Sequence, residues 1–144
     1  MIIVDALNSD LDLLAKMNRE LIQDEGHRNN MDIDQLKTRM ENWITHEYAA
    51  VLFKHEEKIL GYALWREEAG YIYLRQFFVT RESRNRHIGT NAFNQLSSKY
   101  WKNLKVRLDV LVNNTIAQKF WASVGFKNYC ITMELPAVKK LSSR

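Results

Sequence analysis

Two stretches near the start of the chain carry apolar residues at helical spacing. After Asp10, large apolar side chains recur every three or four residues, which predicts a helix that ends near Asp24 with Gly26 as its C-terminal stop. A second stripe of the same kind follows, with Asp32 or Asp34 as its N-cap. The positions that define the two stripes are Leu11, Leu14, Met17, Leu21 and Ile22, and then Ile33, Leu36, Met40, Trp43 and Ile44.

Apolar stretches rich in β-branched and aromatic residues dominate the middle of the chain and predict strands. Residues 70–80 are almost continuously apolar, as expected of a central strand that is covered on both faces. In chain order we expect strands over 1–5, 48–54, 58–66, 70–80, 105–112 and 127–134, with further helices over 88–100 and from a cap at Asn113 or Asn114 to Gly125. This order favours an α/β fold with a mixed, mostly antiparallel central sheet and helices on both faces.

Composition narrows the class of protein. The 144 residues are 46% hydrophobic and 26% charged, which is typical of one globular domain, and we assign it to 1–136 with a short polar tail over 137–144. The single cysteine, Cys130, can neither form an internal disulfide nor supply a zinc site by itself. Because no signal peptide or membrane-spanning stretch is evident either, we expect a cytoplasmic protein with no metal site and no membrane partner.

The net charge of +4 hides two opposed regions. Residues 1–34 hold eight acidic and three basic side chains, whereas residues 80–107 hold seven basic side chains and only Glu82 as an acid. Charge runs are often no more than solvated faces. The asymmetry nevertheless suggests that the basic stretch meets an anion and the acidic stretch a cation.

The segment 77–90 (FFVTRESRNRHIGT) has the features of an anion site. A buried strand leads into a basic loop, and a helix begins at the end of that loop with Gly89 in its first turn. A helix N-terminus offers unpaired N–H groups and a positive dipole end, and Arg84 and Arg86 add charge. Gly89 lets a phosphate approach the backbone. The alternative is an ordinary surface loop that happens to carry arginines.

Residues 84–89 (RNRHIG) resemble the Arg/Gln-x-x-Gly-x-Gly/Ala motif of the GNAT superfamily of N-acetyltransferases. Residues 110–126 contain Val110, Asn114, Ala117 and the pair Phe120-Trp121, then Gly125-Phe126, and look like the second signature of that family. The predicted order of strands and helices also resembles the family's over nearly the whole chain.

The resemblance implies that acetyl-CoA is the cosubstrate. The backbone of Phe77, Phe78 and Val79 would pair with the pantetheine arm as an added strand does. The amides from Arg84 to Thr90 would cradle the pyrophosphate. The full set of implied cofactor-binding residues is Phe77, Phe78, Val79, Arg84, Asn85, Arg86, His87, Ile88, Gly89, Thr90, Asn114, Ala117 and Trp121.

Two residues depart from the family pattern. His87 stands where the family usually has its first glycine, so it is tolerated if its backbone is right-handed and strained if φ is positive. Trp121 stands where many members have a tyrosine that protonates the leaving thiolate. An indole N–H has no useful acidity, so Tyr129 or solvent would have to supply that proton.

A general base is also implied, to deprotonate the acceptor amine. The strand 70–80 carries no acid, which argues against a base on that strand. The candidates are Glu25 and then His27, in the acidic bend before the second helix, and Asp109, which could instead pair with an arginine. For each of these side chains a solvated surface role is the alternative.

The resemblance implies an N-acetyltransferase that moves an acetyl group from acetyl-CoA directly to a primary amine, and the acidic first third favours a small cationic molecule or peptide as the acceptor. One alternative is a module that binds acetyl-CoA with little or no catalysis. Nucleic-acid binding through residues 81–107 is a weaker alternative that the acidic first third argues against, and we expect no nucleic-acid partner. A short C-terminal edge strand would be compatible with a homodimer.

Overall fold

The computed structural model describes residues 1–26 and 28–138. Within them the chain divides into two compact units, Met1–Asn114 and a second unit that begins at Thr115.

The first unit is built on one five-stranded sheet in the order β1-β2-β3-β4-β5. The strands are β1 (Ile2–Asp5), β2 (Tyr48–His55), β3 (Lys58–Glu68), β4 (Tyr71–Val79) and β5 (Lys105–Arg107). The three pairings from β1 to β4 are antiparallel, and β4 pairs with β5 in parallel. The predicted mixed, mostly antiparallel sheet is confirmed.

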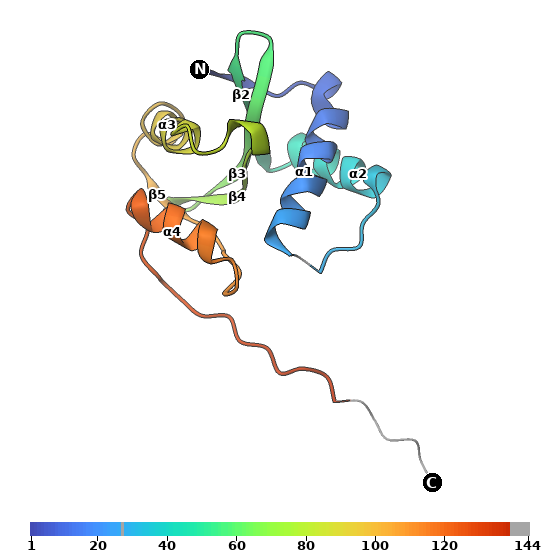
Figure 1. The fold of residues 1–144 in the computed structure, drawn as a ribbon, viewed down its shortest axis with the longest axis vertical. Coiled ribbons are helices and arrows are strands. Elements are labelled where there is room, and N and C mark those ends of the chain that lie inside the picture. Colours follow the sequence, from blue (N-terminus) through green and yellow to red (C-terminus); the bar gives the residue numbers. More distant parts are fainter. Residues whose placement is uncertain (27, 139–144) are drawn as a thin grey trace. The chain divides into compact units, whose positions relative to one another are not determined.

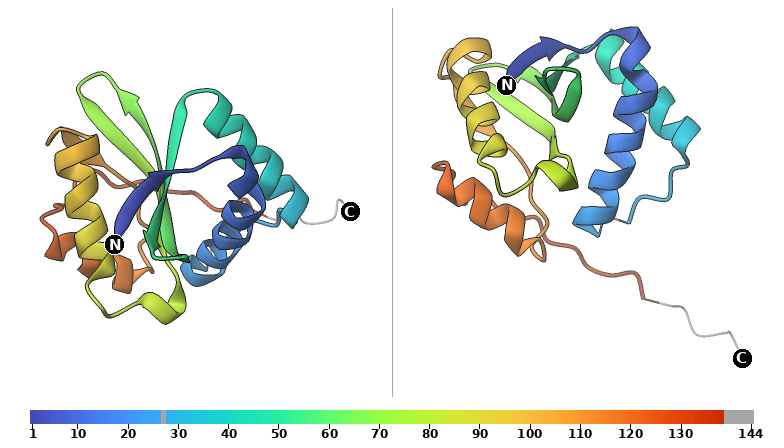
Figure 2. Two further views of the ribbon diagram at one scale, coloured as in Figure 1. Left: turned by 90° about the horizontal axis from the view of Figure 1, so that it is seen from above. Right: turned by 45° about the horizontal axis from the view of Figure 1, so that its top comes forward.

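Helices cover both faces of this sheet, as predicted (Figure 1). The helices α1 (Leu11–Glu25) and α2 (Ile33–Thr45) pack on one face. Their buried apolar side chains, among them Leu14 and Met40, meet Leu52 and Leu64 of the sheet. Figure 2 shows α3 (Ile88–Gln95) on the opposite face from α1 and α2.

An aromatic cluster fills the space beneath α3. The ring of Trp65 on β3 makes edge contacts with Tyr100 and Trp101, at centroid distances of 5.9 and 5.5 Å, and Phe93 of α3 contacts Trp101 at 5.8 Å. After Gln95 the helix widens into one π-helical turn over Leu96–Tyr100. The prediction of a helix from Ile88 to Tyr100 is therefore confirmed, with a change of helix type in its last turn.

The start and stop signals of the first two helices acted as predicted. Asp32 caps α2, where its side chain accepts a hydrogen bond from the amide of Gln35 and the Gln35 side chain accepts one from the amide of Asp32. Gly26 ends α1 in the left-handed conformation, with φ of 63°, that favours glycine at a helix C-terminus.

The two C-terminal strands were predicted incorrectly. The strand expected over 105–112 forms only at Lys105–Arg107, the three residues that pair with Tyr71–Tyr73. The strand expected over 127–134 is absent from the described structure, where residues 126–138 form neither helix nor strand. Alternating apolar side chains create a strand pattern, but a strand also needs a neighbouring backbone to complete its hydrogen bonds. No described segment supplies one here.

The second unit contains α4 (Thr115–Ser123), close to the predicted bounds. The ring of Trp121 contacts Phe120 at 4.8 Å and Phe126 at 5.1 Å. Among the described residues of the chain, no helix is long and apolar enough to span a membrane.

Candidate active site

The loop between β4 and α3 presents a run of free backbone donors. It begins with a turn of 3-10 helix over Arg81–Ser83 and ends at His87, the N-cap of α3. None of the amides from Asn85 to Thr90 donates to an oxygen of the described chain. A surface depression of about 350 Å³ adjoins them, lined by Met1, Arg86, His87, Ile88, Thr90, Asn91 and Asn94. Orphan amides at a helix N-terminus, next to the exposed Arg86, fit an anionic group such as a pyrophosphate.

Asn85 and His87 adopt the left-handed conformation in this loop, with φ of 62° and 60°. Asparagine tolerates that region because its side chain is short and polar, and histidine occurs there more often than most residues, but the Cβ of each still makes the left-handed conformation costly. The second of the two outcomes considered from the sequence is therefore correct, and His87 is strained. This conformation of the N-cap leads the chain from the loop into the first turn of α3.

Replacing His87 with glycine is expected to raise the free energy of unfolding by about 0.5 to 1 kcal/mol. Relief of the left-handed strain outweighs the greater freedom of glycine in the unfolded chain. Urea denaturation of the two proteins measures the difference. The matched control is His87→Ala, which keeps a Cβ and gains nothing, so equal stabilisation by alanine would disprove the strain.

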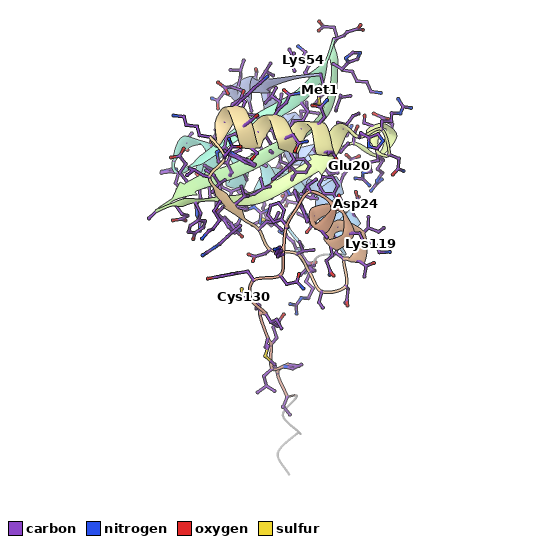
Figure 3. The ribbon with its side chains drawn as sticks, turned by 90° about the vertical axis from the view of Figure 1, so that its left-hand side faces the viewer. Met1, Glu20, Asp24, Lys54, Lys119 and Cys130 are labelled. Atoms are coloured by element: carbon purple, nitrogen blue, oxygen red, sulfur yellow. The ribbon has the colours of Figure 1, made fainter. Side chains whose placement is uncertain are left out.

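An ion-pair cluster fixes the C-terminal end of α1 against this loop. The Asp24 carboxylate accepts a hydrogen bond from Arg84 Nη2 at 2.5 Å and one from Arg81 Nη2 at 2.9 Å. Arg84 Nε also donates to the carbonyl oxygen of Val79 at 2.9 Å. Figure 3 shows Asp24 near the end of α1, one helical turn after Glu20. Burial alone would raise the pKa of Asp24, but the bonds from the two arginines outweigh it and lower the pKa.

This cluster changes the predicted role of Arg84. Its guanidinium is committed to Asp24 and Val79 and lies 5.4 Å from the centre of the Phe78 ring. Its amide donates to the carbonyl of Arg81 at 3.4 Å. Arg84 therefore shapes the loop, and Arg86 is the exposed arginine that remains beside the orphan amides. The sequence analysis did not identify this role of Asp24, because its partners Arg81 and Arg84 lie about sixty positions away in the sequence.

Strands β4 and β5 separate within the sheet. Their pairing ends at Tyr73, and a bulge at Arg75 interrupts the pairing of β4 with β3, since Trp65 pairs with Leu74 and Leu64 with Gln76. From Leu74 onward β4 pairs within the sheet with β3 alone. Phe77, Phe78 and Val79, the predicted pantetheine-binding residues, lie in this part. An edge of this kind accepts an extended ligand in the manner of an added strand.

Glu25, the first base candidate, is half-buried at the last position of α1. Burial raises the pKa of its carboxyl, and the neighbouring charge of Asp24 raises it further. A carboxylate with a raised pKa is suited to accept a proton near neutral pH. His27, the second candidate, lies outside the described residues.

A buried polar cluster lies between α1, α2 and the sheet, and the sequence analysis did not identify it. Tyr62 on β3 donates to Gln76 Oε1 at 2.7 Å, and Arg39 Nη2 donates to Asn18 Oδ1 at 3.1 Å. Burial raises the pKa of Tyr62 well above its usual value, and the charge of Glu25 adds to the shift. The one available signal was Asn18, a fully buried amide among the apolar positions of its helix.

Asp109, the third base candidate, accepts a hydrogen bond from the Tyr73 hydroxyl at 2.9 Å. Burial raises the pKa of Tyr73 to about 12, and the bond to Asp109 contributes. The arginine partner considered for Asp109 is replaced here by a tyrosine. The pair lies where β4 and β5 separate.

The remaining predicted residues fall at the end of the first unit or in the second. Asn114 is the last residue of the first unit, while Ala117 and Trp121 lie on α4. Tyr129, the proposed proton donor, is 75% exposed and lies in the irregular segment after α4. Their predicted contacts with the cosubstrate and the thiolate stay predictions.

Solved structures share this fold. A tetramutant of the BH1408 protein from Bacillus halodurans is 22% identical, with 95% of this chain and all of that chain aligned at a TM-score of 0.76. The aminoglycoside N-acetyltransferase AAC(6')-Iy, bound to a bisubstrate analogue that joins CoA to monomethyl-acetylneamine, is 15% identical over 95% and 97% of the two chains, with a TM-score of 0.74. A predicted acetyltransferase from Clostridium acetobutylicum with acetyl-CoA is 17% identical over 94% and 95%, with a TM-score of 0.73.

No curated protein matches the sequence. The family model of the acetyltransferase (GNAT) family matches residues 14–126, from the first turn of α1 to the residue after Gly125. That range includes both motifs noted in the sequence, the orphan amides of the β4–α3 loop and the separated strands β4 and β5. The chain is therefore a member of the GNAT family of acetyltransferases.

Proposed function

We propose that this chain is an N-acetyltransferase that transfers the acetyl group of acetyl-CoA directly to a primary amine of a small molecule or peptide. The observation that carries the proposal is the run of amides from Asn85 to Thr90 without an acceptor in the described chain, directly after β4. Membership of the family and the CoA-bound relatives add support. The pyrophosphate accepts from these amides, and the pantetheine follows β4 along Phe77–Val79.

The chemical step is an aminolysis of the thioester. The amine nitrogen attacks the acetyl carbonyl, the new C–N bond forms, and the C–S bond breaks as the thiolate leaves. The nitrogen loses one proton to the base, and the thiolate gains one from a donor group or solvent. We assign the base to Glu25, because its carboxyl combines a raised pKa with a position next to Asp24, which is bonded to the cofactor loop.

Replacing Glu25 with glutamine is expected to lower kcat by about 100-fold, the usual scale for losing a general base. In the wild type the rate falls with acid as pH drops through the raised pKa of Glu25, and this limb disappears in the variant. Because burial disfavours the charged carboxylate, the variant keeps its stability at neutral pH. A pH–rate profile with denaturation curves measures both effects.

Glu20→Gln is the matched control, since it removes the same charge from an earlier position on α1. It should leave the profile unchanged. If Glu25→Gln retains both the rate and the acid limb of the wild type, Glu25 is not the base.

Thiol release from acetyl-CoA across a panel of primary amines tests the function itself. Turnover of an amine supports the proposal. Trp121 and the absence of an acid on β4 favour the second candidate, a module that binds acetyl-CoA without chemistry. Tight binding of acetyl-CoA with no turnover of any amine would establish that candidate instead.

A further inference from the structure

Two arginines share one aromatic ring on the face of the sheet that α1 and α2 cover. The guanidinium carbon of Arg39 lies 4.4 Å from the centre of the Trp43 ring, and that of Arg75 lies 4.5 Å from it. Arg39 comes from α2, and Arg75 is the bulge residue of β4. The site therefore joins the helix pair to the point where β4 and β5 separate.

Neither guanidinium forms an ion pair with a carboxylate of the described chain. A third arginine in the cluster, Arg66, is neutralised by Glu68. Arg66 and Arg75 both donate to the Tyr48 hydroxyl, at 2.7 and 3.3 Å. Two like charges thus lie together without a counter-charge in this part of the protein. Burial lowers the pKa of Arg39, and the charge of Arg75 lowers it further.

Buried donors at the same place lack acceptors. Arg39 Nε and Asn18 Nδ2 are both buried without a hydrogen-bond partner in the described chain, and Asn18 has no exposed surface. Native proteins satisfy nearly all buried polar groups. A guanidinium fits a carboxylate through two parallel hydrogen bonds, and the aromatic ring beneath holds it flat. The orphan donors lack an acceptor oxygen, and the two unpaired guanidinium charges favour one that belongs to an anion.

We infer that Arg39 and Arg75 form a carboxylate-binding subsite, and that the acceptor is an amine that also carries a carboxylate, as an amino acid or a peptide with a free C-terminus does. The inference rests on the proposed acetyl transfer and narrows its substrate class. It also adds a carboxylate to the expected cationic amine, since Arg39 and Arg75 hold two positive charges without an ion pair in the described chain.

Matched pairs of amines test the inference. Lysine and cadaverine present the same distal amine with and without a carboxylate, and β-alanine and β-alaninamide differ only at the acid. In each pair, the wild-type kcat/KM for the amine that carries the carboxylate is expected to be at least about tenfold higher than that for the amine without it. This factor is the scale of one good charged hydrogen bond. Equal or better turnover of cadaverine and the amide would overturn the inference.

Variants separate the subsite from general effects. Arg75→Gln and Arg39→Gln should each raise KM for the acid, so that the ratio of kcat/KM for the acid to kcat/KM for the amide approaches one. KM for acetyl-CoA should stay unchanged. Arg75→Gln should disturb the fold less than Arg39→Gln, because Arg75 is exposed and Arg39 is partly buried. Lys37→Gln is the matched control, since it removes a positive charge from the same helix at an exposed ion pair with Asp12. If Arg75→Gln has the same acid-to-amide ratio as wild type, the proposed subsite is wrong.

A binding measurement keeps the two proposals distinct. Calorimetry with N-acetyl-β-alanine in the presence of CoA needs no turnover. Tenfold weaker binding to Arg75→Gln than to wild type supports the carboxylate subsite even if no amine is acetylated, in which case only the proposed function fails. Equal binding to the two proteins, or none to wild type, overturns the subsite.

Discussion

Replacing Gly89 with valine is expected to weaken the binding of acetyl-CoA by at least about 100-fold while leaving the fold intact. Gly89 is the second residue of α3, among the amides that donate to no described oxygen. A branched side chain there would crowd the approach of a phosphate to those amides, which glycine leaves open. Loss of even two charge-assisted hydrogen bonds, at about 1.5 kcal/mol or more each, is enough for this factor.

Stability should change little, because glycine is itself a poor helix former and valine in the first turn costs no more. Calorimetric titration with CoA and urea denaturation measure the two quantities. Gly89→Ala is the graded control, since its single methyl group should weaken binding less than valine does. Wild-type affinity in the valine variant would show that the pyrophosphate binds elsewhere.

Local patterns in the sequence were enough to predict most elements of the first unit. The apolar stripes of α1 and α2 and the caps at Asp32 and Gly26 depend on residues within a few positions of one another. The sheet and its helices on both faces followed from the order of those elements. The hydrophobic pattern at 127–134 predicted a strand that does not form in the described structure, because a strand depends on a distant partner that local sequence does not reveal.

For the candidate site, the sequence predicted the position of the backbone donors but not the contacts of the side chains. The RNRHIG segment located the orphan amides, yet the side chain of Arg84 turned out to bind Asp24 rather than face the ligand. The unpaired arginines Arg39 and Arg75 were not identified, because their meeting at Trp43 depends on how α2 packs over β4. Long-range pairing of side chains is a property of the packed fold, and no local spacing encodes it.

Gly61 is the position where we expect a single methyl group to damage the sheet most. It lies on β3 opposite Val79 of β4 and Phe53 of β2. A Cβ there would lie 2.0 Å from the carbonyl oxygen of Phe78 and 3.0 Å from Cδ2 of Phe53. The first contact is with backbone, so it is relieved only if β4 moves away from β3. Such movement breaks sheet hydrogen bonds beside the buried Phe78.

Gly61→Ala is therefore expected to lower the free energy of unfolding by about 3 kcal/mol, at the upper end of the cost of overpacking. That is a large fraction of the about 5 to 15 kcal/mol that stabilise a typical domain. Because the displaced residues Phe78 and Val79 belong to the proposed pantetheine edge, any folded variant should also bind CoA more weakly. Urea denaturation followed by CoA titration of the folded fraction measures both effects.

Gly70→Ala gives the matched comparison for this cost. Gly70 lies in the turn between β3 and β4 with φ of 86°, and a Cβ there meets nothing within 4 Å. Alanine at this site incurs only backbone strain, about 1 kcal/mol, and leaves the β4 edge in place. CoA affinity should therefore fall in Gly61→Ala and hold in Gly70→Ala. If both variants lose stability equally and neither loses affinity, close packing at Gly61 does not position β4 for its ligand.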